Sequence, residues 1–111
     1  MQILIHTDRT IPASDRLQQL LEAAVAAATS RFGAQITRIQ AHLSDVNSDK
    51  GGVDKRCVLE ARPAGLDPVV ATHQAATVEL AIAGAGEKLG RSLDSIAGRL
   101  ASSRYDTPGN A

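Results

Sequence analysis

The chain has 111 residues, enough for one domain with its own core and too few for two ordinary ones. Apolar residues make up 43% and charged residues 22%, a balance typical of a folded globular protein and not of a disordered one. Lysine plus arginine equals aspartate plus glutamate, 12 each, so contact with nucleic acid would have to come from local clusters of charge rather than from the net charge.

Aromatic residues make up only 2% of the chain, which argues against a platform of several rings on which single-stranded bases stack. The single cysteine, Cys57, excludes an internal disulfide framework. The N-terminal residues begin a strand pattern directly, without the charged and long apolar regions of a secretory signal. No apolar run approaches the length of a membrane span. We therefore expect a cytoplasmic protein without a membrane partner.

The first third of the chain predicts a strand followed by a helix. A run rich in β-branched residues predicts the strand over residues 2–6. Ser14 can cap a helix, and apolar residues at spacings of three and four predict that this helix covers residues 13–31. Gly33 is placed to end the helix, with Phe32 packing at its exit.

The next two runs alternate between apolar and polar residues, which predicts adjacent antiparallel strands over residues 35–45 and 53–62. The segment between them, VNSDKGGVD, is typical of a flexible hairpin tip. One face of the hairpin would pack on the core. The other would carry most of the charge, with Glu60 as its single acid and a mildly basic set of Arg38, His42, Arg56 and Arg62.

The last third predicts a short strand and a long helix. A turn from Pro63 to Pro68 precedes the strand, which we expect over residues 69–73. The helix is expected over residues 76–102, capped by Thr77 or a neighbour. Its apolar stripe repeats at spacings of three and four through Val78, Ile82, Ala85, Leu89, Leu93, Ile96 and Leu100.

The predicted order of elements is β-α-β-β-β-α. Both helices can lie on one face of a four-stranded sheet and leave the other face open. We therefore predict a two-layer α+β fold in a single domain over residues 1–104. The polar residues 105–111 are expected to form a disordered tail.

The sequence offers little for catalysis. Cys57 is in phase with the buried positions of its strand, so we interpret it as a small core residue rather than a nucleophile. No two histidines stand four apart, no HExxH motif is present, and the aspartates around the hairpin tip do not match a calcium-binding loop. We expect no catalytic residue, metal or cofactor, and an enzyme using Cys57 is the least favoured hypothesis.

Basic residues form the more informative clusters. Lys55 and Arg56 belong to the hairpin. Lys88 and Arg91 stand three apart and so share one face of the long helix, with Arg99 two turns further along. Two interpretations stay open from these residues alone. The helix face is either an ordinary solvated surface on which acids alternate with bases, or a stripe that contacts nucleic-acid phosphates.

Three segments, in this order of elements, resemble the ribosome hibernation-promoting factor and ribosome-associated inhibitor family in its short form, also labelled sigma-54 modulation protein. They are RIQAHLSD, DKRCVLEARPAGLDPVVATH and AIAGAGEKLGRSLDSIAGRL. The resemblance covers residues 1–104. Its most specific parts are Arg31-Phe32 after the first helix, the spacing of eleven residues from Ala71 to Ile82, and Glu87-Lys88-Leu89 with Arg91 and Leu93.

The resemblance implies a non-catalytic protein that binds the small ribosomal subunit in the channel used by mRNA and tRNA, and inhibits translation in stationary phase or stress. It implies contacts to 16S rRNA phosphates through basic residues of both helices, and no small-molecule substrate. Carried over by position, Lys88 and Arg91 match the second helix and Arg31 the end of the first. The suspected rRNA-binding set is completed from the clusters above and comprises Lys88, Arg91, Arg99, Arg31, Lys55 and Arg56.

The chain departs from the typical pattern of that family in its charge. Where family members are richer in lysine on the first helix, this chain has AAVAAA, and its net charge is zero. The alternative hypothesis is therefore a regulatory module of the same fold whose partner is a protein, bound through the open sheet face or an edge strand. Salt-insensitive association with a protein, and no binding to ribosomes, would distinguish this alternative.

Overall fold

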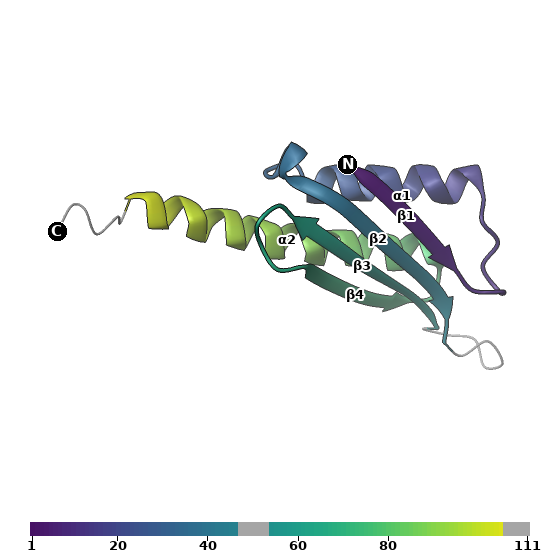
Figure 1. Cartoon of the computed structure of the whole chain (residues 1–111). Coiled ribbons are helices and arrows are strands. Elements are labelled where there is room, and N and C mark those ends of the chain that lie inside the picture. The colour runs from purple at the N-terminus through teal and green to yellow at the C-terminus, as the bar shows by residue number, and fades with distance from the viewer. Residues whose placement is uncertain (47–53, 106–111) are drawn as a thin grey trace.

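A computed structural model of the chain describes residues 1–46 and 54–105, with side chains as far as residue 100. Two helices lie against one face of a four-stranded sheet (Figure 1). This arrangement confirms the predicted two-layer α+β fold with its β-α-β-β-β-α order. The expected tip of the hairpin, residues 47–53, and residues 106–111 of the expected tail lie outside the described residues.

The strands follow one another across the sheet in the order of the sequence. The first strand runs parallel to the second because a helix carries the chain back between them, whereas the other two pairs are antiparallel. The predicted hairpin is confirmed, with Ala41 opposite Leu59 in its centre. The bounds are β1 (Gln2–Thr7), β2 (Ile36–Asp45), β3 (Lys55–Pro63) and β4 (Val69–Ala75).

Helix α1 (Asp15–Ala28) begins at the predicted cap and ends earlier than predicted. The hydroxyl of Ser14 accepts a hydrogen bond at 3.1 Å from a backbone N–H of the first turn. At the other end, the hydroxyl and the N–H of Thr29 both donate to the carbonyl of Val25, at 2.8 and 2.9 Å. The chain then leaves the helix, and Gly33, with φ of 53°, belongs to the following 3-10 turn (Gly33–Gln35) rather than to the end of the helix.

Helix α2 (Val78–Tyr105) is the longest element and projects beyond the ends of the strands (Figure 1). The predicted cap is confirmed, since the hydroxyl of Thr77 accepts from the N–H of Leu80 at 3.2 Å. Its end lies beyond the predicted residue 102. The apolar stripe predicts that Leu100 is buried, yet it is 41% exposed, because the helix has outrun the sheet by that point. No helix among the described residues is long and apolar enough to span a bilayer.

The core lies between the helices and the inner face of the sheet, and it is aliphatic apart from Phe32 and Cys57. Small residues let the helices approach closely. A Cβ atom built on Gly86 would lie 3.3 Å from the Cβ of Ala24, so even an alanine there would require the two helices to shift slightly apart. The largest fully buried side chains are Leu21, Ile36, Ile39, Leu59, Leu89, Leu93, Val25 and Cys57.

Candidate functional site

The six suspected RNA-binding residues do not form one cluster. Four of them belong to the helical layer, by which we mean α1, α2 and the turn after α1: Arg31, Lys88, Arg91 and Arg99. The other two belong to β3, where alternate residues point to opposite faces of the sheet. Lys55 is on the inner face and Arg56 on the open face, by which we mean the face not covered by the helices.

Arg91 and Arg99 are brought together by α2. Both side chains are exposed, and they line a shallow cleft of about 330 Å³. Ser92, Ser95 and Ile96 line the same cleft, between Arg91 and Arg99 along the helix. Two arginines flanking hydroxyl donors make a surface suited to phosphate oxygens.

Lys88 points elsewhere, although it shares one side of the helix with Arg91. Its ammonium group donates a hydrogen bond at 3.1 Å to the backbone carbonyl of Thr72 on β4. Because β4 is an edge strand, that carbonyl faces away from the sheet. Lys88 therefore lies along the edge of the sheet and places a charge where another strand could otherwise pair.

Arg31 is exposed in the turn after α1. The end of α1 packs on the middle of α2, since a Cβ atom on Gly90 would lie 3.5 Å from the Cα atom of Ala28. The turn that carries Arg31 is thus at the end of the helix pair from which α2 projects (Figure 1). Arg31 and Arg99 occupy the same end of the helical layer.

Lys55 has its charge compensated within the protein. Its ammonium group contacts the carboxylates of Asp54 at 2.9 Å and Asp45 at 3.1 Å. These hydrogen bonds, with that to Asp54 the stronger, raise the pKa of Lys55 above its ordinary value. The side chains of both aspartates are less than one-tenth exposed. This ion pair joins the ends of β2 and β3, so we expect Lys55 to contribute least of the six to binding.

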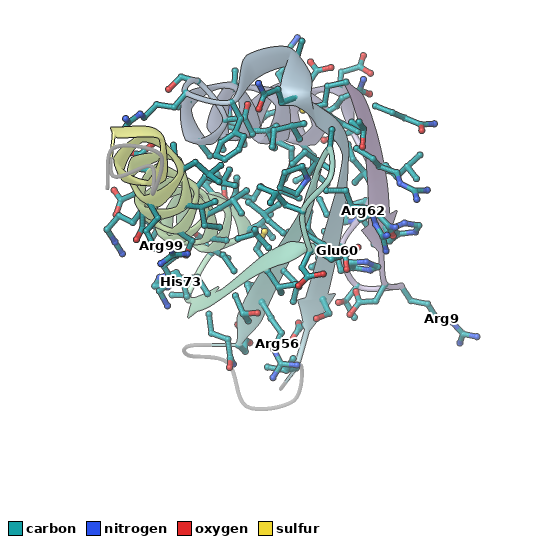
Figure 2. All side chains as sticks on the ribbon, turned by 60° about the vertical axis from the view of Figure 1, so that its left-hand side comes forward. Arg9, Arg56, Glu60, Arg62, His73 and Arg99 are labelled. Atoms are coloured by element: carbon teal, nitrogen blue, oxygen red, sulfur yellow. The ribbon has the colours of Figure 1, made fainter. Side chains whose placement is uncertain are left out.

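The open face carries the basic residues that the alternation predicted. Arg38 on β2 lies opposite Arg62 on β3, and Glu60 pairs with Arg62 at 3.6 Å. Arg56 lies further along, and its Nε atom is buried without a hydrogen-bond partner in the described structure. Figure 2 shows Arg62 and Arg9 on the side of the sheet away from α2, whereas Arg99 is on the side of α2.

Sequence reasoning missed one feature of the open face. The rings of His6 and His42 stack with their centroids 4.6 Å apart and their planes 12° from parallel. The two residues meet because β1 and β2 pair in parallel with His6 opposite His42. The alternation of β1 could have indicated that His6 shares a face with Gln2 and Leu4, but the pairing that joins it to His42 is not visible in either strand alone.

The two faces differ in their balance of charge among the described side chains. On the helical layer bases and acids are equal in number: Arg16, Arg31, Lys88, Arg91 and Arg99 against Asp15, Glu22, Glu79, Glu87 and Asp94. On the open face of the strands three arginines and two histidines share the surface with one acid, Glu60. The open face is therefore the more basic of the two.

Cys57 is buried completely in the core, which confirms the interpretation from its phase. Desolvation raises the pKa of its thiol to about 12, so the thiolate that a nucleophile needs is scarce near neutral pH. Among the residues the structure describes, no three His, Cys, Asp or Glu side chains gather as a metal site would require.

These features define a small two-layer α+β domain with a charged surface on each layer. Over residues 4–101 the chain matches the sequence model of the family described as "Sigma 54 modulation protein / S30EA ribosomal protein", and it belongs to that family. The resemblance stated from the sequence is thus confirmed. A comparison with curated protein sequences gives no match.

Solved structures with the same fold include two described as follows. The N-terminal domain of Protein Y from Thermus thermophilus is 19% identical, with a TM-score of 0.71, covering 86% of this chain and 99% of that one. A ribosomal subunit interface protein from Coxiella burnetii is 16% identical, with a TM-score of 0.70, covering 88% and 99%. At these identities the likeness concerns the fold.

Proposed function

We propose that the protein is a non-catalytic factor that binds the small ribosomal subunit, occupies its mRNA and tRNA channel, and inhibits translation in stationary phase or stress. Membership of the family supports association with ribosomes. The name of the Coxiella burnetii structure, a ribosomal subunit interface protein with this fold, points the same way. The proposed channel and the effect on translation go beyond these names.

The observation that carries the proposal is the cleft between Arg91 and Arg99. Its two arginines and two serines can donate hydrogen bonds and are exposed on α2, and Ile96 lines the cleft beside them. Guanidinium groups bind phosphate through two parallel hydrogen bonds, so a cleft of this kind suits the backbone of 16S rRNA. Arg31 lies at the same end of the helical layer and would extend the contact.

The balanced charge of the helical layer bears on how the proposed binding would behave. Glu87 and Asp94 lie beside Arg91 in the groove between the helices, so they reduce the potential at that point. We expect binding that weakens steeply with salt, because each phosphate contact releases condensed counterions.

The direct test is co-sedimentation of the purified protein with 30S subunits and 70S ribosomes at about 50 and 200 mM salt, the range over which phosphate contacts lose most affinity. Binding at the lower concentration that fades at the higher one would support the proposal. Absence of binding at both would contradict it.

Charge reversal tests the cleft itself. We expect Arg91→Glu to weaken 30S binding at least tenfold, because it removes one phosphate contact and adds a repulsion. Arg16→Glu is the matched control, since Arg16 is 76% exposed at the other end of the helical layer. Its ion pair with Glu79, at 3.8 Å, contributes little at such exposure. Equal loss in the two variants would mean that the position of the charge does not matter and would reject the cleft.

The second candidate is the protein-binding module of the same fold. The observation that favours it is Val70 on the open face of β4, which is 55% exposed beside charged neighbours. Such a module would associate with a protein without dependence on salt and would leave ribosomes unbound.

A further inference from the structure

We propose that the open face of the sheet is a second RNA-binding surface, on which Arg38, Arg62 and Arg56 contact phosphates independently of the helical layer. This inference rests on the proposed function, because it takes ribosomal RNA as the partner. It differs from the expectation carried by the family resemblance, which placed the contacts on the two helices.

The pair of Arg38 and Arg62 gives the first argument. The two residues are opposite each other on neighbouring antiparallel strands, where like charges destabilise the sheet. Glu60 contacts the guanidinium of Arg62 at 3.6 Å and offsets part of the repulsion. One acid beside a pair of arginines leaves a net positive charge that a phosphate above the strands would balance.

Arg56 gives a second and independent argument at the other end of the face. Its Nε atom is buried and has no partner in the described structure, although buried donors are nearly always paired. Its neighbours in register are Ser44 and Gln74, neither of which accepts a hydrogen bond from it. The side chain as a whole is half-buried, so a phosphate on the open face would contact the exposed part of the guanidinium and compensate a charge whose Nε lacks a partner.

The spacing of these residues suits an extended polyanion. Arg38 and Ser44, the partner of Arg56 in register, are six residues apart on β2, a distance of about 20 Å at the rise of a strand. The stacked imidazoles of His6 and His42 lie between them and add polar N–H groups. The basic face thus extends along several nucleotides rather than around one phosphate.

The charges favour RNA over an acidic protein segment as the occupant. Arginine forks match phosphate oxygens on any nucleotide, so three guanidinium groups spread along the strands need no particular sequence to bind. The exposed apolar residue of this face, Val70, lies on the edge strand β4, away from Arg38 on β2. The proposed contact is therefore concentrated on β2 and β3.

The experiment compares two double variants that each remove two positive charges. Arg38→Gln/Arg62→Gln neutralises the open face, and Arg91→Gln/Arg99→Gln neutralises the cleft on α2. Affinity for purified 30S subunits is measured at several salt concentrations for both variants and for the unaltered protein. Thermal melting checks that the sheet variant still folds, which we expect because it removes two opposed like charges.

We expect the sheet variant to bind at least tenfold more weakly and to show a smaller salt slope. On single-stranded RNA, the slope of log K against log salt falls by about 0.7 for each phosphate that the protein no longer neutralises. If the unaltered protein binds and the sheet variant binds equally well, the inference is overturned while the proposed function stands. A weaker affinity with an unchanged slope would indicate a protein partner and would also overturn it. If the unaltered protein does not bind 30S subunits, both the proposed function and this inference are contradicted.

Discussion

The helical layer and the open face of the sheet share one core and use charge in different ways. On the helical layer the described acids equal the bases in number, and the cleft at Arg91 and Arg99 gathers two bases with no acid among its lining residues. On the open face Arg38 and Arg62 lie opposite each other on β2 and β3, and Glu60 lies beside Arg62 on β3. The net charge of zero therefore combines surfaces with different local charge, and a polyanion would bind according to the local charge rather than the net charge.

The two regions also differ in packing. The helices touch through alanine and glycine, which brings their backbones close together. The described side chains of the open face are half-buried or exposed, and no helix covers them. Substitutions at the contact between the helices should therefore change stability, whereas those of exposed charged residues on either surface should change binding.

The largest effect on stability is expected where α2 meets the edge of the sheet. A Cβ atom on Gly84 would overlap the imidazole ring of His73, so Gly84→Ala forces the ring or the helix to move. We expect a loss of about 1–3 kcal/mol in the free energy of unfolding, measured by denaturant titration.

Gly98→Ala is the matched control for that substitution. No atom lies within 4 Å of a Cβ at Gly98, so the change should stabilise the helix by about 0.5–1 kcal/mol. In the double variant His73→Ala/Gly84→Ala the obstacle is gone, and part of the lost stability should return. If the Gly84→Ala protein is as stable as the unaltered one, the imidazole ring of His73 can move aside without a cost in stability, which would contradict the prediction.

A second prediction uses the two faces of the sheet. Cys57→Ser places a hydroxyl in the core where desolvation already raises the pKa of the thiol to about 12, and we expect a loss of about 1–3 kcal/mol. Val70→Thr adds a hydroxyl to a side chain that is 55% exposed on the open face, and it should cost less than about 0.5 kcal/mol. Equal losses in denaturant titrations would refute the assignment of inner and open faces.

The smallest effect concerns pH and the connection from the sheet to the helical layer. The carboxylate of Asp8 accepts from the N–H of Asp45 at 2.8 Å and from the N–H and hydroxyl of Thr10 at 3.0 and 2.8 Å. These bonds, with that from Asp45 the strongest, lower the pKa of Asp8 below its ordinary value. The stability they provide is present above the unfolded pKa, near 3.9. It is lost as the pH falls through the lower folded value.

Asp8→Asn should therefore flatten the acid limb of the stability curve, measured as melting temperature between about pH 2 and 6. Thr10→Val removes one donor to the same carboxylate and should flatten the limb only partly. An acid limb in Asp8→Asn as steep as that of the unaltered protein would show that other groups dominate it.

Local patterns are sufficient to predict most of the fold. The periods of 2 and 3.6 indicate the element order and the inner and open faces, and the residue types at the helix starts indicate the caps at Ser14 and Thr77. They fail where the outcome depends on distant parts of the chain. The stripe on α2 predicts a buried Leu100, but its burial depends on how far the sheet extends beneath the helix. The helical pattern carries no information about the length of the sheet.

The candidate site is predictable in its residues and not in their grouping. Arg91 and Arg99 lie together because helical spacing is local. The ammonium group of Lys88 donates to the carbonyl of Thr72 on β4, and that of Lys55 contacts the carboxylates of Asp45 and Asp54. Such contacts between distant parts of the chain arise only once the sheet is formed. Whether any of the six residues binds rRNA stays a prediction.

The projection of α2 past the sheet has a thermal consequence. A helix of 28 residues is about 42 Å long, and its packed part ends near Ile96. Isolated helices shorter than about 12–15 residues are marginal in water, so the turns from Gly98 onward rely on the packed part for their order. On warming, the part of α2 from Gly98 onward would fray while the sheet is still folded. Any contact between Arg99 and a partner would then lose affinity at a temperature well below that at which the domain unfolds.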